Sequence, residues 1–146
     1  MKKYSTEKLR NVCLMGHGGV GKTSFAEAMI FDSKASDRLG KISDGTTVTD
    51  YDPEEIKRAI SINTSMAPIE WNDVKINIID TPGYFDFVGE VEEAVSAADA
   101  AIIVVSGKAG MEVGALKAWE LCEKYHLPRM VYVSDMDVDQ ASYKEV

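Results

Sequence analysis

Residues 16–23 are the part of the chain whose residue types and spacing could bind phosphate. They read Gly-His-Gly-Gly-Val-Gly-Lys-Thr, which fits the phosphate-loop pattern G-x-x-x-x-G-K-[ST]. Glycines allow the backbone to curl so that its N–H groups point toward a bound anion. We predict that Lys22 reaches the β- and γ-phosphates of a nucleotide and that the Thr23 hydroxyl ligates Mg²⁺. The predicted nucleotide-binding residues of this segment are His17, Gly18, Gly19, Val20, Gly21, Lys22, Thr23 and Ser24.

A second motif, Asp80-Thr81-Pro82-Gly83, follows an apolar run that is typical of a buried strand. Asp80 is predicted to hold Mg²⁺ through a water molecule, and the Gly83 N–H is predicted to bond the γ-phosphate. The alternative is a simple turn after a strand, because Thr-Pro-Gly is common turn chemistry. The phosphate-loop pattern earlier in the chain favours the functional interpretation.

Two shorter segments could complete a nucleotide site. The hydroxyl of Ser61 could join the Mg²⁺ shell when a γ-phosphate is present, which would order the loop before it as a switch. Asp137, after the last predicted strand, could accept hydrogen bonds from the N1–H and the exocyclic amino group of guanine, a donor pair that adenine lacks. Taken alone, each residue is also typical of a solvent-facing position in an acidic protein.

The elements that must position these residues alternate between strands and helices. Hydrophobic patterns predict strands over residues 12–15, 60–71, 74–80, 100–105 and 130–133. They predict helices over residues 24–30, 90–98 and 112–126, a short helical turn from Asp52, and the start of a helix at Asp139. Residues 32–50 are predicted to form a long, mobile loop.

The strands over 60–71 and 74–80 should form an antiparallel hairpin, with Pro68 at a sheet edge. The fold class is therefore α/β of the phosphate-loop NTPase kind, with a mainly parallel sheet, one antiparallel edge strand and helices on both faces. Because a helix begins near the end and no strand follows it, we expect the domain to be incomplete at its C-terminus.

Composition narrows the class of protein. The 146 residues are enough for one domain with a hydrophobic core. The net charge of −8 argues against a nucleic-acid-binding surface on this chain. Cys13 and Cys122 are expected to be core residues in a reducing compartment. The chain has neither an apolar run long enough to span a membrane nor a signal peptide, so a cytoplasmic location is expected.

Taken in order, these motifs resemble the GTP-binding domain of translational GTPases, and that of elongation factor G most closely. The resemblance covers nearly the whole chain and rests on residues 16–23, 58–64, 80–83, 109–113, 127–129 and 136–137. Residues 44–52 have their counterpart in the elongation factor G-like branch. The resemblance implies a switch domain that binds GTP or GDP with Mg²⁺, held by Thr23, Ser61 and Asp80. It further implies that residues 1–146 are a truncated N-terminal domain, and that domains missing from this chain contact the ribosome.

The chain departs from the family pattern at several positions. Tyr84 stands where the family has the histidine that orients the attacking water, and a phenol is a poor base at neutral pH. Ser134 and Asp135 replace the asparagine and lysine of the guanine-binding motif, so Ser134 and Asp137 are the remaining candidates there. Gly19 replaces an aspartate, and Ser61 replaces a threonine but keeps its hydroxyl.

Three functions therefore remain open. The first is a GTPase with weak or partner-dependent hydrolysis, in which Lys22, Gly83 and Tyr84 are the catalytic candidates. The second is a nucleotide-binding module that does not hydrolyse GTP. The third is a partition-type ATPase, which the absence of a second lysine early in the phosphate loop disfavours.

Overall fold

The computed structural model describes residues 2–139, 141–144 and 146. Five strands form its sheet, and they are β1 (Leu9–Gly16), β2 (Ser65–Trp71), β3 (Val74–Asp80), β4 (Ala100–Ser106) and β5 (Arg129–Ser134). Their order across the sheet is β2-β3-β1-β4-β5. β1 pairs in parallel with β3 and β4, and β4 pairs in parallel with β5, whereas β2 runs antiparallel to β3. The predicted sheet, with its antiparallel edge strand, is confirmed.

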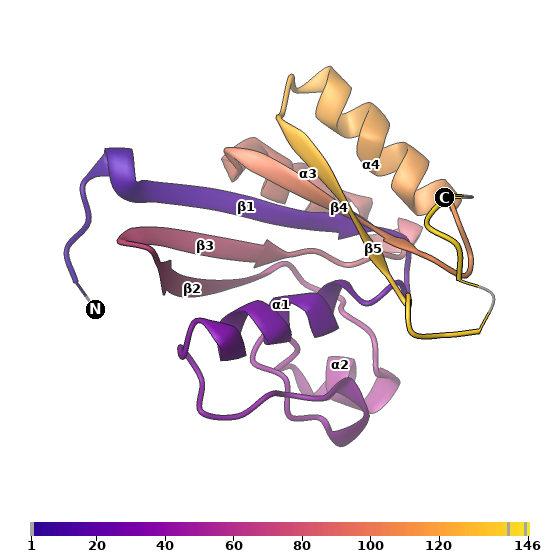
Figure 1. The fold of residues 1–146 in the computed structure, drawn as a ribbon, viewed down its shortest axis with the longest axis horizontal. Coiled ribbons are helices and arrows are strands. Elements are labelled where there is room, and N and C mark those ends of the chain that lie inside the picture. Colours follow the sequence, from indigo (N-terminus) through magenta and orange to yellow (C-terminus); the bar gives the residue numbers. More distant parts are fainter. Residues whose placement is uncertain (1, 140, 145) are drawn as a thin grey trace.

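Helices cover both faces of this sheet (Figure 1). They are α1 (Lys22–Asp32), α2 (Pro53–Arg58), α3 (Val88–Ala97) and α4 (Val113–Lys124). α3 and α4 lie over one face and α1 over the other (Figure 1). Short 3₁₀ turns occur at Thr6–Lys8, Ile42–Asp44 and Phe85–Phe87.

β1 lies in the middle of the sheet, and its side chains alternate between two hydrophobic clusters. Cys13 and Met15 face the cluster under α3 and α4, while Leu14 faces the cluster under α1. This alternation is the period of two that a strand imposes. Cys122 of α4 is in the same cluster as Cys13, and both thiols are buried, as expected of core cysteines.

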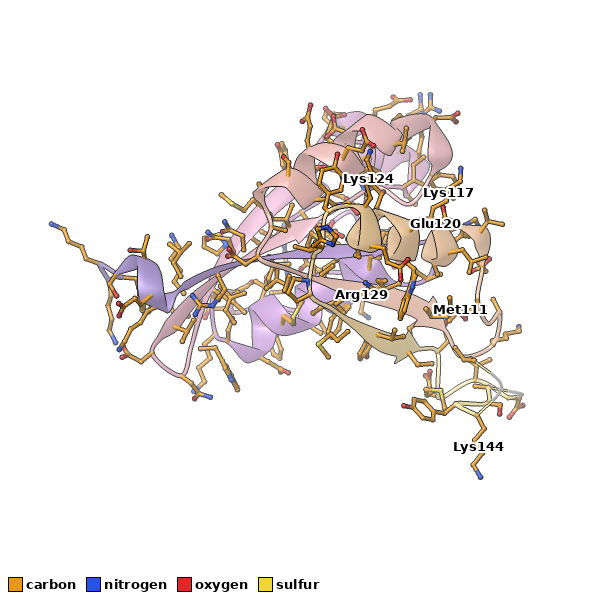
Figure 2. All side chains as sticks on the ribbon, turned by 90° about the horizontal axis from the view of Figure 1, so that it is seen from above. Met111, Lys117, Glu120, Lys124, Arg129 and Lys144 are labelled. Atoms are coloured by element: carbon orange, nitrogen blue, oxygen red, sulfur yellow. The ribbon has the colours of Figure 1, made fainter. Side chains whose placement is uncertain are left out.

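α4 packs on the sheet through small residues. Ala115, Ala118 and Cys122 are buried, whereas the larger Leu116 and Trp119 remain substantially exposed. Small side chains allow the helix axis to approach the strands closely. Charged residues line the outer side of α4, where Lys117, Glu120 and Lys124 are labelled in Figure 2.

The structure confirms the predicted helix cap, tight turn and loop. Asp52 and Glu55 form the predicted capping box of α2. The Asp52 side chain accepts the Glu54 N–H, and the Glu55 side chain accepts the Asp52 N–H. Asn72 and Asp73 both have positive φ, as the tight turn between β2 and β3 requires. Residues 32–50 contain, after the end of α1, a 3₁₀ turn but no longer element, in agreement with the predicted loop.

Two predicted elements differ from the structure. The strand predicted from Ile60 begins at Ser65, because residues before it bond to glutamate side chains instead of to β3. The helix predicted from Asp139 is wrong, because the described residues from 139 to 146 form no helix; residues 140 and 145 lie outside the described part. None of the helices described is long and apolar enough to cross a membrane.

Candidate nucleotide-binding site

The phosphate loop connects the C-terminal end of β1 to the N-terminus of α1. Gly19 and Gly21 have φ values of +83° and +90°, which glycine adopts at little cost. Gly16 lies so close to the carbonyl oxygen of Val104 that a Cβ there would collide with it. The loop therefore needs glycine for two reasons: its left-handed turns, and the close approach of β4.

The Lys22 side chain crosses the inside of this loop. Its Nζ donates to the carbonyl oxygen of His17 at 2.7 Å, with that of Gly16 at 3.3 Å. Lys22 is only 5% exposed, and burial lowers the pKa of its ammonium group to about 8. The nearby carboxylates of Asp80, Asp50 and Glu112 act in the opposite direction and raise this pKa, because they favour the charged ammonium. A bound phosphate would favour the charged ammonium in the same way.

Hydroxyl groups converge on the carboxylate of Asp80 at the end of β3. Thr23 Oγ1 donates to Asp80 Oδ2 at 2.8 Å, and Thr49 Oγ1 donates to the same oxygen at 3.2 Å. The Ser61 hydroxyl lies 3.0 Å from Thr23 Oγ1. Three predicted metal-binding residues, separated by up to 57 positions in the sequence, therefore meet at one point. Thr49 is a member of this cluster that sequence reasoning missed.

The electrostatics of Asp80 suit a site for a cation. Its side chain is 1% exposed, and Oδ1 is buried without a hydrogen-bond partner among the described residues. Burial raises the pKa of Asp80 to about 6, although the hydroxyl of Thr23 and the ammonium of Lys22 lower it. Burial also raises the pKa of the neighbouring Asp50.

Thr23, Ser61 and Asp80 could hold a Mg²⁺ ion that takes its other ligands from water and phosphate. No group of three His, Cys, Asp or Glu side chains that could hold a metal occurs in the part of the chain that the structure describes. The donors present are two hydroxyls, from Thr23 and Ser61, and the carboxylate of Asp80. Mg²⁺ keeps several waters and commonly uses one or two carboxylates together with phosphate oxygens, so this small donor set is suitable.

The segment after β3 closes over the phosphate loop. The Thr81 hydroxyl donates to the carbonyl oxygen of Leu14 at 2.6 Å and is fully buried. Gly83 follows, and a Cβ there would collide with Lys22 Nζ and with the backbone of Gly18. The Gly83 N–H therefore lies beside the phosphate loop, which is the position that a hydrogen bond to a γ-phosphate requires.

Tyr84 covers the phosphate loop with its ring. A Cβ added to Gly18 would lie 2.9–3.2 Å from three carbons of that ring, so a side chain at this position would require the ring to shift. Tyr84 as a whole is 45% exposed. Tyr84 also lines a cavity of ≈ 150 Å³ together with Gly19, Lys22 and Ser61. The residue that replaces the family histidine therefore lies at the predicted phosphate site.

The loop after β5 reaches the phosphate loop through Ser134. Ser134 Oγ donates to the carbonyl oxygen of Val20 at 2.7 Å. Asp135 has a positive φ of 54°, and its Oδ2 accepts from the Ser106 hydroxyl at 2.7 Å, which turns the carboxylate toward the end of β4. Asp137 lies exposed in the following turn. Ser134 thus contacts the predicted site directly.

Two glutamates hold the loop that carries Ser61. Glu27 of α1 is 1% exposed, and its Oε1 accepts the Val48 N–H at 2.5 Å. Glu90 of α3 accepts the Thr64 N–H at 2.7 Å, and the Thr64 hydroxyl donates to the Glu90 carbonyl at 3.0 Å. Sequence reasoning missed both residues, because these bonds join positions more than 20 residues apart and leave no local pattern.

Comparison with known proteins identifies the family. Residues 7–146 match the family model of the elongation factor Tu GTP-binding domain. The mitochondrial ribosome-releasing factor 2 of Drosophila melanogaster is 38% identical over 144 residues, which are 99% of this chain and 20% of that protein. An elongation factor G-like protein of Mycobacterium tuberculosis is 37% identical over 137 residues, covering 94% of this chain and 19% of that protein.

A crystal structure of a protein from Thermus thermophilus has the same fold, with a TM-score of 0.83 and 44% identity. It is matched over 85% of this chain and 19% of its own. The chain spans about a fifth of the length of the curated relatives it matches. These matches confirm the resemblance to translational GTPases and decide against the partition-type ATPase. The chain belongs to the family of elongation factor Tu GTP-binding domains.

Proposed function

We propose that this chain binds the phosphates of GTP and GDP at residues 16–23, with Mg²⁺ between the nucleotide and Asp80. The observation that carries the proposal is the meeting of Thr23, Ser61 and Asp80 beside the buried amine of Lys22. In this arrangement Lys22 neutralises β- and γ-phosphate charge, and the loop N–H groups bind the remaining oxygens. Mg²⁺, when bound, supplies further charge neutralisation on these oxygens.

We propose that hydrolysis of GTP is slow or depends on a partner. The Tyr84 ring covers Gly18, so its phenol is close enough to hydrogen-bond a water at the phosphate. A phenol accepts a proton poorly at neutral pH, and the rate therefore depends on Lys22 and on the Gly83 N–H for charge stabilisation. The second candidate, a module that binds GTP without hydrolysing it, is favoured by the same replacement of histidine.

We propose that Asp137 reads the guanine base and that Ser134 supports the site from the phosphate-loop side. The bond from Ser134 to Val20 ties the base-side loop to the phosphate loop. The Asp135 carboxylate is bonded to Ser106, which keeps its negative charge on the side of β4. Without the amide and the lysine stem of the family's guanine-binding motif, affinity for guanine nucleotides should be about ten- to a hundredfold lower than with them.

We also propose that residues 1–146 are the N-terminal part of a GTP-binding domain in a longer protein that acts on the ribosome. β5 is at one edge of the sheet, and three successive apolar residues on it are substantially exposed, Met130, Val131 and Tyr132. An apolar edge strand of this kind calls for a covering element. The ribosome is suggested by the names of relatives that are about five times longer, ribosome-releasing factor 2 among them.

Isothermal titration calorimetry tests the proposed binding. The 146-residue protein is titrated with GDP, a non-hydrolysable GTP analogue and ADP, each in the presence of Mg²⁺. We expect GDP and the GTP analogue to bind more tightly than ADP, and chelation of Mg²⁺ to weaken both. Equal affinity for ADP and GDP would refute the role of Asp137, whereas no binding of any nucleotide would refute the site as a whole.

A further inference from the structure

We propose that Glu55 is a positioning residue that holds the Ser61 hydroxyl at the phosphate loop. The inference rests on the proposed role of Ser61 as a ligand of Mg²⁺ in the triphosphate state. Glu55 lies in α2, is 1% exposed, and contributes hydrogen-bond acceptors from its side chain and its backbone to the segment around Ser61. The local sequence explains only its capping function in α2.

The backbone is bonded to Glu55 on both sides of Ser61. Before it, the Ile60 N–H donates to the Glu55 carbonyl oxygen at 3.3 Å. After it, the N–H groups of Ile62 and Asn63 donate to Glu55 Oε1 at 2.9 and 3.0 Å. Ala59, with a positive φ of 54°, reverses the chain at the end of α2 so that these contacts can form. Ser61 therefore lies between residues whose N–H groups all donate to Glu55.

The second carboxylate oxygen fixes the side chain of Glu55 itself. Oε2 accepts the Asp52 N–H at 3.2 Å, so the carboxylate is held by three backbone donors in total. A buried carboxylate is tolerated when its oxygens are hydrogen-bonded in this way. Both oxygens act as acceptors; a glutamine keeps one acceptor oxygen that can still bind the N–H groups of Ile62 and Asn63, whereas a methionine of similar length has none.

The geometry at Ser61 depends on this closure. Ser61 Oγ lies 3.0 Å from Thr23 Oγ1, and Thr23 in turn donates to Asp80 at 2.8 Å. A displacement of about 1 Å at a ligand is enough to lose much of its contribution to binding. Because Glu55 lies outside this cluster and acts through the backbone, it positions Ser61 and does not itself contact the nucleotide.

The variant Glu55→Met, which has no side-chain acceptor, tests the inference by the ratio of two affinities. The 146-residue protein is titrated with a non-hydrolysable GTP analogue and with GDP at saturating Mg²⁺. Loss of both side-chain bonds to the segment should lower affinity for the GTP analogue by about tenfold and leave that for GDP unchanged. Hydrogen exchange should also become faster at the amides of Ile62 and Asn63 in the analogue complex.

Two control variants separate positioning from helix stability. Asp52→Ala removes the other half of the capping box, because the Asp52 side chain accepts the Glu54 N–H at 2.7 Å, but it leaves the residues after Ser61 untouched. Glu54→Gln changes an exposed carboxylate that pairs with Arg58 in the same helix. Both variants should keep the wild-type ratio of affinities.

Three results would overturn the inference. The first is an equal loss of affinity for both nucleotides in Glu55→Met, which would mean general destabilisation. The second is the same change of ratio in Asp52→Ala, which would assign the effect to capping of α2. The third is an unchanged ratio despite faster exchange at Ile62 and Asn63. Absence of nucleotide binding by the wild-type protein would instead overturn the proposed function and remove the basis of this inference with it.

Discussion

Replacement of Lys22 by methionine should separate the function of the phosphate loop from the stability of the fold. Lys22 is 5% exposed, and burial lowers the pKa of its amine from 10.5 to about 8. A pKa change of this size corresponds to a cost of roughly 3 kcal/mol for keeping the charged form in the folded, nucleotide-free protein. Methionine has a similar length and no charge, so it removes this cost.

The loss of one hydrogen bond offsets part of the gain. Lys22 Nζ donates to the His17 carbonyl at 2.7 Å, and a bond of this kind from a charged donor contributes about 1.5–3 kcal/mol. We therefore expect Lys22→Met to raise the free energy of unfolding by about 1 kcal/mol at neutral pH, without nucleotide. The same variant should lose GDP binding, because the phosphates lose their buried cation.

Urea unfolding with and without GDP measures both effects. GDP should stabilise the wild-type protein and leave Lys22→Met unchanged, since a ligand stabilises only the state that binds it. Between the lowered pKa of about 8 and the ordinary value of 10.5, the unfolded wild-type chain binds more protons than the folded one. Its stability should therefore rise with pH across this window, and the rise should be absent in the variant. Lys57→Met, at an exposed lysine of α2, is the matched control.

The reasoning would be refuted by a variant that is less stable than wild type, or by one that still binds GDP tightly. The first result would show that the amine is adequately solvated in the folded state. The second would show that the backbone N–H groups of residues 16–23 bind the phosphates without Lys22.

Three further predictions concern neighbouring residues. Tyr84→His should hydrolyse GTP faster in a multiple-turnover phosphate-release assay; an unchanged rate would mean that another group limits the chemistry. Burial raises the pKa of Asp80 from 3.8 to about 6, so without Mg²⁺ the stability of the wild-type protein should fall as pH rises across this window, and Asp80→Asn should lack this fall in urea unfolding. Thr81→Val should lower the free energy of unfolding by about 1–2 kcal/mol, because it removes the buried bond to the Leu14 carbonyl; no loss would show that this bond contributes nothing net.

Features set by neighbours in the sequence were predictable. The phosphate loop, the capping box at Asp52 and the turn at Asn72 each depend on residue types at fixed short spacing, and the structure has the expected conformation at each. The mainly parallel sheet followed from the alternation of strands and helices. The convergence of Ser61 on Thr23 was also anticipated, from a hydroxyl just before the predicted edge strand, and the family resemblance supported it.

Features set by long-range hydrogen bonds were not predictable. β2 begins at Ser65, later than predicted, because the N–H groups of residues 62–64 donate to the glutamates at positions 55 and 90. A β-branched and apolar composition favours a strand there, and the tertiary contacts override it. Likewise, nothing local shows that Asp135 turns toward Ser106. The assignment of Asp137 to the guanine base stays a prediction.

The paired bonds between Thr64 and Glu90 have a consequence for the entropy of the two segments that they join. One segment precedes β2 and carries Ser61; the other is the first turn of α3, which follows Gly83 and Tyr84. When either segment becomes ordered, these bonds reduce the conformations open to the other, so the entropic cost of ordering both is less than the sum of the separate costs. A γ-phosphate that contacts one segment would thus make the second easier to order, and the two would respond to nucleotide cooperatively.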